Sequence, residues 1–228
     1  MSETSFAENC DTVISLGAHC ETAEQIARFF GKKTNGPFDW MITPVDSVCK
    51  ILEDDGQHLG QKLVAGWQGK SIQCNYYGCV YFHEFDRIDD GRVLFDIDAL
   101  TRLREKMLHK MGTLIKSYRS SNNVLFVRAH GKSDAPGDRM QTEPLRSADL
   151  NRLVEVIRSK APDLNFRLLF ARADGRDNES FELNEPLAKE IIVREVRNPQ
   201  NLGWQGDEET WANALESLGF VRAGVDAS

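Results

Sequence analysis

The sequence lacks the features that define several large classes of proteins. It contains no apolar run close to the roughly 20 residues that a membrane-spanning helix needs. Residues 1–11 are polar and acidic, so no basic segment followed by an apolar one marks a secretory leader. The five cysteines are few and odd in number, unlike the disulfide framework of a secreted domain. We therefore expect a cytoplasmic protein that does not associate with membranes.

Several cofactor and metal motifs are also missing. The sequence has no glycine-rich dinucleotide fingerprint, no phosphate-binding P-loop and no His-Glu-x-x-His zinc motif. Cys74, Cys79 and His83 have the spacing of half a zinc site, but structural zinc takes four ligands and no fourth one lies nearby in the sequence. We expect neither a cofactor nor a metal. The 35 acidic against 28 basic residues, a net charge of −7, disfavour binding to nucleic acid.

The alternation of apolar runs and amphipathic segments predicts an α/β protein. Four runs have the composition of buried strands, namely residues 12–16, 123–128, 165–170 and 190–196. Amphipathic patterns predict helices at about residues 20–30, 44–52, 99–118, 147–159 and after Asp207. This order favours one domain over residues 1–228, with a mostly parallel sheet flanked by helices. Residues 53–97 are punctuated by glycines and predict an irregular insertion with a short strand or two, folded over the main sheet.

Small polar residues and a glycine mark the expected ends of these helices. Asp98, Ser147 and Asp207 each precede an amphipathic segment and are typical N-cap residues. Gly31 directly follows the first helical segment, where glycine favours the left-handed conformation that ends a helix. Residues 1–11 are expected to form a loose leader before the first strand.

A cysteine at a strand-to-helix turn is the first candidate for chemistry. The first strand leads through Gly17 to Cys20, where the first helix is expected to begin. Unpaired N–H groups and the dipole at a helix start favour negative charge, so we expect a lowered pKa and a reactive thiolate at Cys20. The alternative is a buried cysteine that acts only as a small apolar residue.

A nucleophilic thiol needs a base, and the positions of the five histidines in the sequence make some of them better candidates for this base than others. His58 lies in a polar turn and His109 among the charged residues of a helix. His19 adjoins the cysteine, and neighbouring side chains at a helix start point apart. His83, expected on a strand among aromatic residues, and His130, directly after a strand, are the two candidates. A hydrogen-bonded structural histidine is the alternative for either.

An aspartate and an arginine add to the candidate site. Asp39 lies between two aromatic residues and can orient an imidazole as the third member of a triad, or instead cap its own turn. Arg128 ends an apolar strand and can bind a substrate carboxylate or phosphate through two hydrogen bonds, or form an ion pair. The carboxyl ends of parallel strands share one edge of a sheet, so residues 17–20 and 128–130 are expected to meet there.

Four pieces of the sequence carry a resemblance to a known family. They are Ile14-Ser15-Leu16-Gly17 with Cys20, Gly36-Pro37-Phe38-Asp39-Trp40, Phe82-His83-Glu84-Phe85 and Leu125-Phe126-Val127-Arg128. In this order they resemble a bacterial domain family of unknown function that is described as papain-like cysteine peptidases. The resemblance covers about residues 12–130 and implies Cys20 as nucleophile and His83 as base. It also implies a helix packed on an antiparallel barrel-like sheet, whereas the strand order favours a parallel sheet.

The layout of the predicted elements also resembles SGNH-type esterases. In both, a nucleophile follows the first strand and an acidic residue, here Asp207, precedes the last helix. The Asp-x-x-His pattern of those enzymes would put histidine where Thr210 stands. This second resemblance therefore supports the fold more than the activity.

Together these residues predict a cysteine-dependent hydrolase or acyltransferase, peptidase-like by resemblance. Its catalytic residues are expected to be Cys20 as nucleophile, His83 as base and Asp39 as the carboxylate that orients the base. The substrate site is expected to include Gly17, His19, Trp40, Arg128 and His130. The expected substrate is an unidentified peptide, ester or glycan-linked compound. The alternative is a non-catalytic ligand-binding or glycan-pathway accessory protein in which the cysteine is simply packed.

Overall fold

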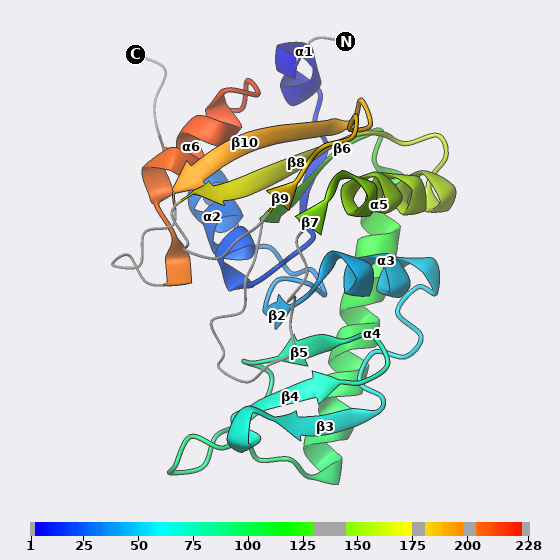
Figure 1. Ribbon diagram of the computed structural model, residues 1–228, viewed down its shortest axis with the longest axis vertical. Coiled ribbons are helices and arrows are strands. Elements are labelled where there is room, and N and C mark those ends of the chain that lie inside the picture. The colour runs from blue at the N-terminus through cyan, green and yellow to red at the C-terminus, as the bar shows by residue number, and fades with distance from the viewer. Residues whose placement is uncertain (1–2, 130–144, 175–180, 198–203, 225–228) are drawn as a thin grey trace.

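A four-stranded parallel sheet, hereafter the main sheet, forms the centre of the molecule (Figure 1). The computed structural model describes residues 3–129, 145–174, 181–197 and 204–224. The strands of the main sheet are, in spatial order, β1 (Thr12–Ser15), β6 (Asn123–Ala129), β8 (Asn165–Asp174) and β10 (Ile191–Arg197). The prediction of an α/β fold with a parallel sheet is confirmed, and the antiparallel barrel-like sheet implied by the papain resemblance is not present among these strands.

Helices cover both faces of the main sheet (Figure 1). They are α1 (Glu3–Glu8), α2 (Cys20–Phe30), α3 (Val45–Glu53), α4 (Ile97–Ser120), α5 (Ser147–Lys160) and α6 (Glu208–Glu216). Along β6, Phe126 faces a core shared with α3, α4 and α5, whereas Val127 faces a core shared with α2 and α6. Successive strand residues point to opposite faces, which separates the two cores. Burying a side chain such as Phe126 contributes about 1.5–3 kcal/mol.

The predicted insertion supplies three strands of a regular antiparallel sheet, hereafter the small sheet, and the segment before α3 supplies the fourth. Its spatial order is β2 (Met41–Ile42), β5 (Cys79–Tyr81), β4 (Ser71–Cys74) and β3 (Leu63–Gly66), with a short 3₁₀ helix, η1 (Trp67–Gly69), after β3. The expectation that this region folds over the main sheet is wrong. Figure 1 shows the small sheet beside the far half of α4, which runs from the main sheet to the small one.

Two further features were not predicted. Residues 3–8, expected to be a loose leader, form α1, whose Phe6 is buried in the core that α2 and α6 share. A two-stranded parallel pair, β7 (Leu145–Arg146) and β9 (Phe181–Glu182), lies outside the main sheet. None of the described helices combines the length and the apolar character needed to span a bilayer.

Two of the predicted helix ends are confirmed. Helix α2 begins at Cys20, and Gly31 ends it with a left-handed φ of 63°. Asp207 caps α6, since its Oδ1 accepts hydrogen bonds from the backbone N–H groups of Glu209 (3.0 Å) and Thr210 (3.2 Å). Side-chain caps of this kind satisfy N–H groups that have no partner within the helix.

Two other helix starts differ from the prediction. Helix α4 begins at Ile97, and its cap is Asp96, whose Oδ1 accepts from the N–H of Ala99 at 2.7 Å. Asp98, the predicted cap, therefore lies inside the first turn. Ser147 is the first residue of α5 rather than its N-cap.

The cap of α4 can be tested by two matched substitutions. Asp96→Ala should lower the free energy of unfolding by about 1 kcal/mol, because the N–H of Ala99 loses its acceptor. Asp98→Ala removes only a favourable charge near the helix start and should cost less than about 0.5 kcal/mol. Urea unfolding of both variants measures the difference. A larger loss for Asp98→Ala would contradict this assignment of the cap.

Candidate functional site

The chain reaches Cys20 through a strained turn. A Cβ at Gly17 (φ +72°) would lie 2.7 Å from Thr43 Oγ1 and 3.0 Å from the carbonyl oxygen of Phe38, so only glycine fits. Ala18 has a φ of 94°, a conformation that costs a residue with a Cβ about 1–3 kcal/mol. The carbonyl oxygen of Ala18 accepts from the N–H of Thr43 at 2.9 Å. Strain held in this way by the surrounding structure is typical of functional sites.

Arg128 fixes the same turn from the centre of the main sheet. Its Nη1 donates to the carbonyl oxygen of Leu16 (2.8 Å) and its Nη2 to that of Thr43 (2.6 Å). The residue is 2% exposed, and burial lowers the pKa of its guanidinium to about 10, so the group remains charged at pH 7. Among the described residues no carboxylate pairs with it. These two bonds inside the core give Arg128 a structural role in holding the turn, and its predicted role in substrate binding stays a prediction.

Cys20 is the first residue of α2 but lies in a buried setting. It is 8% exposed, and burial is the main reason that the pKa of its thiol is raised, to about 11. Its own backbone N–H opposes this shift, while the negative charges of Asp39 and Glu84 add to it. The prediction of a lowered pKa is therefore wrong, because loss of water outweighs the effect of the helix start. At pH 7 the thiol is neutral.

Asp39 caps its own turn, as the alternative interpretation proposed. It is fully buried, and its Oδ2 accepts from the N–H of Gly36 at 2.6 Å. Burial raises the pKa of its carboxyl group; the hydroxyl of Thr34, the N–H of Gly36, the charge of Lys110 and the hydroxyl of Ser15 oppose that shift. No hydrogen bond to an imidazole is found among the described residues. Its role as the orienting member of a triad stays a prediction.

His83 lies directly beyond the strand on which it was expected. β5 ends at Tyr81, and His83 is partly exposed to solvent. Its ring packs edge-on against Trp40 with 5.9 Å between ring centroids, and Trp40 in turn packs against Trp204 at 6.4 Å. Partial burial, with a contribution from Arg87, lowers the pKa of His83, so its ring is neutral at pH 7. Within the described parts of the chain, no hydrogen bond joins this ring to the thiol of Cys20.

The residue after the cysteine is a buried acid that the sequence analysis did not single out. Glu21 is 1% exposed and its Oε1 accepts from Trp211 Nε1 of α6 at 2.8 Å. Its Oε2 lies 3.7 Å from Nε2 of His19. His19 is thus directed toward this carboxylate, and its predicted role in substrate binding stays a prediction. A glutamate within the packed side of a helix is the signal that could have revealed this contact.

A group of buried charges surrounds the segment that carries His83. The Glu84 side chain is 3% exposed and its Oε2 lies 2.5 Å from Nζ of Lys106. Lys110, one turn further along α4, is also buried, and this burial lowers the pKa of its ammonium group against the attraction of Glu84 and Asp39. A lysine inside the apolar stripe of α4 is the signal that marks this cluster in the sequence.

Two segments that are distant in the sequence, residues 38–40 and residues 82–84, therefore place carboxylates that act on Cys20. The middle of α4 lies near both of these segments, because Lys110 interacts with Asp39 and Glu84. His130 lies outside the described residues. The described parts contain no group of three His, Cys, Asp or Glu side chains arranged to hold a metal ion.

Comparisons with known proteins concern mainly the N-terminal part of the chain. Residues 11–63 match a family described as "Putative papain-like cysteine peptidase (DUF1796)". This segment contains the strained turn, Cys20 and Asp39, and it ends before His83. The chain is also 22% identical over 229 residues to "Uncharacterized protein R408" of Acanthamoeba polyphaga mimivirus. The aligned region covers 89% of this chain and 96% of that protein. No solved structure gives a significant match. These comparisons support the peptidase resemblance for residues 11–63, and they do not establish a bacterial origin.

The structural role assigned to Arg128 predicts a loss of stability on substitution. Arg128→Met should lower the free energy of unfolding by about 2–4 kcal/mol, because the buried carbonyl oxygens of Leu16 and Thr43 lose their donors. Arg102→Met, at an exposed position on α4, should change it by less than about 0.5 kcal/mol. Urea unfolding measures both. If the two variants lose equally little, the guanidinium does not hold the turn.

The raised pKa of Cys20 predicts the pH dependence of its alkylation. Below a pKa of about 11 each pH unit changes the thiolate fraction tenfold, so the rate with iodoacetamide should rise steeply from pH 7 to pH 9.5. Residue-resolved mass spectrometry gives the rate for each cysteine, and Cys10, which is less buried, serves as the internal comparison. A rate that is already level at pH 8 would show that the site stabilises the thiolate after all.

Proposed function

We propose that this protein is a cysteine-dependent hydrolase or acyltransferase that acts through Cys20. The observation that carries the proposal is the position of Cys20 at the start of α2, directly after a strained turn. Asp39 and Glu84, which lie in two other sequence motifs, act on the thiol electrostatically. The family match over residues 11–63 agrees with a thiol nucleophile in this segment.

A neutral thiol must lose its proton as it attacks, and we assign this task to His83. The ring of His83 is neutral at pH 7, so it can accept the proton from Sγ. As Sγ bonds to the acyl carbon, the carbonyl π bond opens and its electrons move to oxygen. Collapse of this intermediate breaks the bond to the leaving group, which takes the proton from the imidazolium. The product is a thioester at Cys20.

A second nucleophile then completes the reaction. Water gives hydrolysis and another acceptor gives acyl transfer; in both cases the thioester bond breaks and Sγ regains a proton through His83. The first N–H groups of α2 have no partner within the helix and can donate to the oxyanion that forms in each half of the reaction. The charges of Asp39 and Glu84 disfavour the free thiolate, so sulfur stays unreactive until the base acts.

A non-catalytic binding protein is the second candidate, and one observation favours it. Cys20 is only 8% exposed and its pKa is raised to about 11, as expected for a cysteine that packs as a small apolar residue. In that case the strained turn serves to position the carbonyl groups around Thr43, and no thioester forms.

The two candidates differ in whether an activated ester acylates Cys20. Incubation with p-nitrophenyl acetate should release p-nitrophenolate in a burst and add one acetyl group to Cys20, as seen by peptide mass spectrometry. Cys20→Ser should abolish the burst. His83→Asn should slow it by about 10²–10⁴, the usual contribution of a general base, whereas His19→Asn should have little effect.

Controls separate this result from simple changes in folding. Cys10→Ser keeps the proposed site intact and should retain the full burst. Circular dichroism should show nearly the same unfolding midpoint for His83→Asn and the unmodified protein, because His83 lies outside the core and is partly exposed to solvent. No acetylation at Cys20 would favour the binding protein, and acetylation that is unchanged in His83→Asn would exclude His83 as the base.

A further inference from the structure

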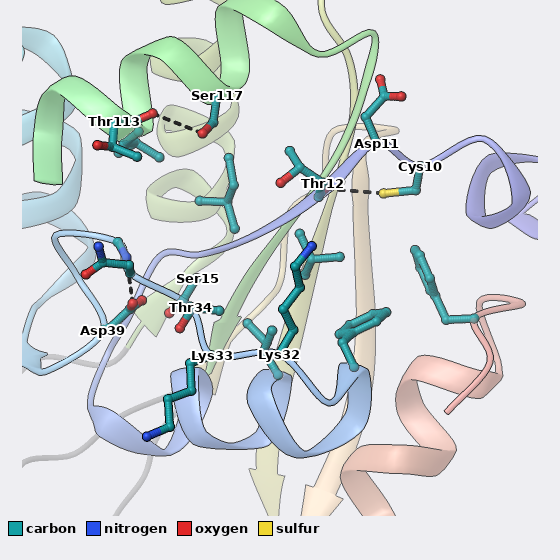
Figure 2. A pocket seen from close by; sticks show the side chains of 18 of the residues that line it. Cys10, Asp11, Thr12, Ser15, Lys32, Lys33, Thr34, Asp39, Thr113 and Ser117 are labelled. Carbon is teal, nitrogen blue, oxygen red and sulfur yellow. Dashed lines mark hydrogen bonds between the residues drawn. The ribbon is translucent and has the colours of Figure 1, made fainter. Parts of the chain in front are cut away.

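A cavity separate from Cys20 opens along the free edge of the main sheet (Figure 2). Its volume is about 380 Å³, and all four residues of β1 line it. β1 is the terminal strand of the described main sheet, pairing with β6 on one side only. Such an edge directs backbone N–H and C=O groups away from the sheet, where an extended peptide can bind them. One of these groups, the carbonyl of Thr12, accepts a weak hydrogen bond from Cys10 Sγ at 3.3 Å.

Asp39 lines one end of the cavity with a buried carboxylate. The residue is fully buried, and its Oδ1 has no hydrogen-bond partner of ordinary geometry among the described residues. Figure 2 places the side chains of Ser15 and Thr34 beside this carboxylate, at the carboxyl end of β1. These hydroxyls and the charge of Lys110 offset the burial of the carboxylate only in part, because the pKa of Asp39 remains raised. A bound ammonium group would supply further N–H donors and the opposite charge.

Lys32 supplies a cation toward the other end. In Figure 2 its side chain extends across the cavity toward Thr12, the first residue of β1, whereas Lys33 points away. Lys32 forms no ion pair with a described residue, so its charge is available to a ligand. The first and last residues of β1 lie about 10 Å apart, at roughly 3.3 Å per residue.

We propose that this cavity binds a short peptide of about three residues, in extended form along the edge of β1. Its amino-terminal ammonium group lies at Asp39 and its terminal carboxylate at Lys32, so the peptide runs antiparallel to β1. An extended tripeptide spans about 10 Å, the length of the strand. The apolar wall, which includes Ile14, Phe30 and Phe220, accommodates small apolar side chains. Cys20 does not line this cavity, so the proposal does not rest on the reaction proposed for the thiol, although Asp39 acts on both.

Calorimetric titration with trialanine tests the site, and two blocked forms test its ends. Trialanine should bind with a Kd of about 1 mM or tighter. N-acetyl-trialanine lacks the ammonium group and trialanine amide lacks the carboxylate, and each should bind about tenfold more weakly.

Three variants assign these preferences to residues. Asp39→Asn keeps an oxygen for the N–H of Gly36. This variant should bind trialanine and N-acetyl-trialanine with the same affinity, because the charge that attracts the ammonium group is gone. Lys32 is exposed, and Lys32→Met should bind trialanine and trialanine amide with the same affinity, because the charge that attracts the carboxylate is gone. Lys33→Met, the matched control, should bind like the unmodified protein.

Two outcomes overturn the proposal. One is the absence of binding at about 10 mM trialanine; the other is an unchanged preference for the free termini in both Asp39→Asn and Lys32→Met. Cys20→Ser should bind trialanine normally, so a failed acylation of Cys20 leaves the peptide site standing. Loss of binding in Cys20→Ser would place the peptide at the thiol instead and also overturn the proposal.

Discussion

The contact between one buried guanidinium and two carbonyl oxygens determines the geometry of the candidate site. Arg128 joins the end of β1, at Leu16, to the segment before α3, at Thr43. The N–H of Thr43 in turn donates to the carbonyl oxygen of Ala18. This bond helps to hold Ala18 at its unfavourable positive φ. The charge of Arg128 is buried and has no carboxylate partner in the part of the chain that the structure describes; such burial is costly, and the two hydrogen bonds offset part of the cost. The position of Cys20 at the start of α2 follows from this arrangement.

The electrostatic setting of Cys20 shows two opposing effects in one place. The start of a helix favours a thiolate, but burial and the carboxylates of Asp39 and Glu84 favour the thiol, and together they prevail. A site of this kind protects its sulfur from chance oxidation and alkylation, since both require the thiolate. It also makes any reaction dependent on a base that removes the proton at the moment of attack. The neutral ring of His83 meets the electronic requirement for that base.

Local sequence patterns predicted the parts of the fold that depend on local physics. The continuous apolar runs indicated buried parallel strands, and Gly31 marked the end of α2 because only a residue that tolerates positive φ suits that position. The cap of α4 was placed at Asp98 instead of Asp96, since two acids in one short stretch are equally good caps from sequence alone. The sequence predicted a short strand or two in residues 53–97 but not their assembly into the small sheet, because the strands of this sheet have two to four residues, too few for a periodic signal.

The candidate site was less predictable, because its properties arise from distant contacts. The raised pKa of Cys20 depends on residues 39 and 84 and on burial, none of which the helix-start argument considers. An arginine at the end of a strand suggests a site for an anion, yet the guanidinium of Arg128 donates to two backbone carbonyl groups inside the core. Glu21 finds its partner, Trp211, 190 positions away. The roles of Cys20, His83 and Asp39 in catalysis remain predictions.

The bond between Glu21 and Trp211 has a consequence for the chain while it is being made. Translation adds about 5–20 residues per second, so roughly 10–40 s separate the synthesis of these two partners. During that interval α6 does not exist, and the start of α2 cannot reach its final packing. A ribosome-bound chain therefore exposes the beginning of α2 to solvent, and a product that stops short of residue 211 never acquires the mature environment of its neighbouring cysteine.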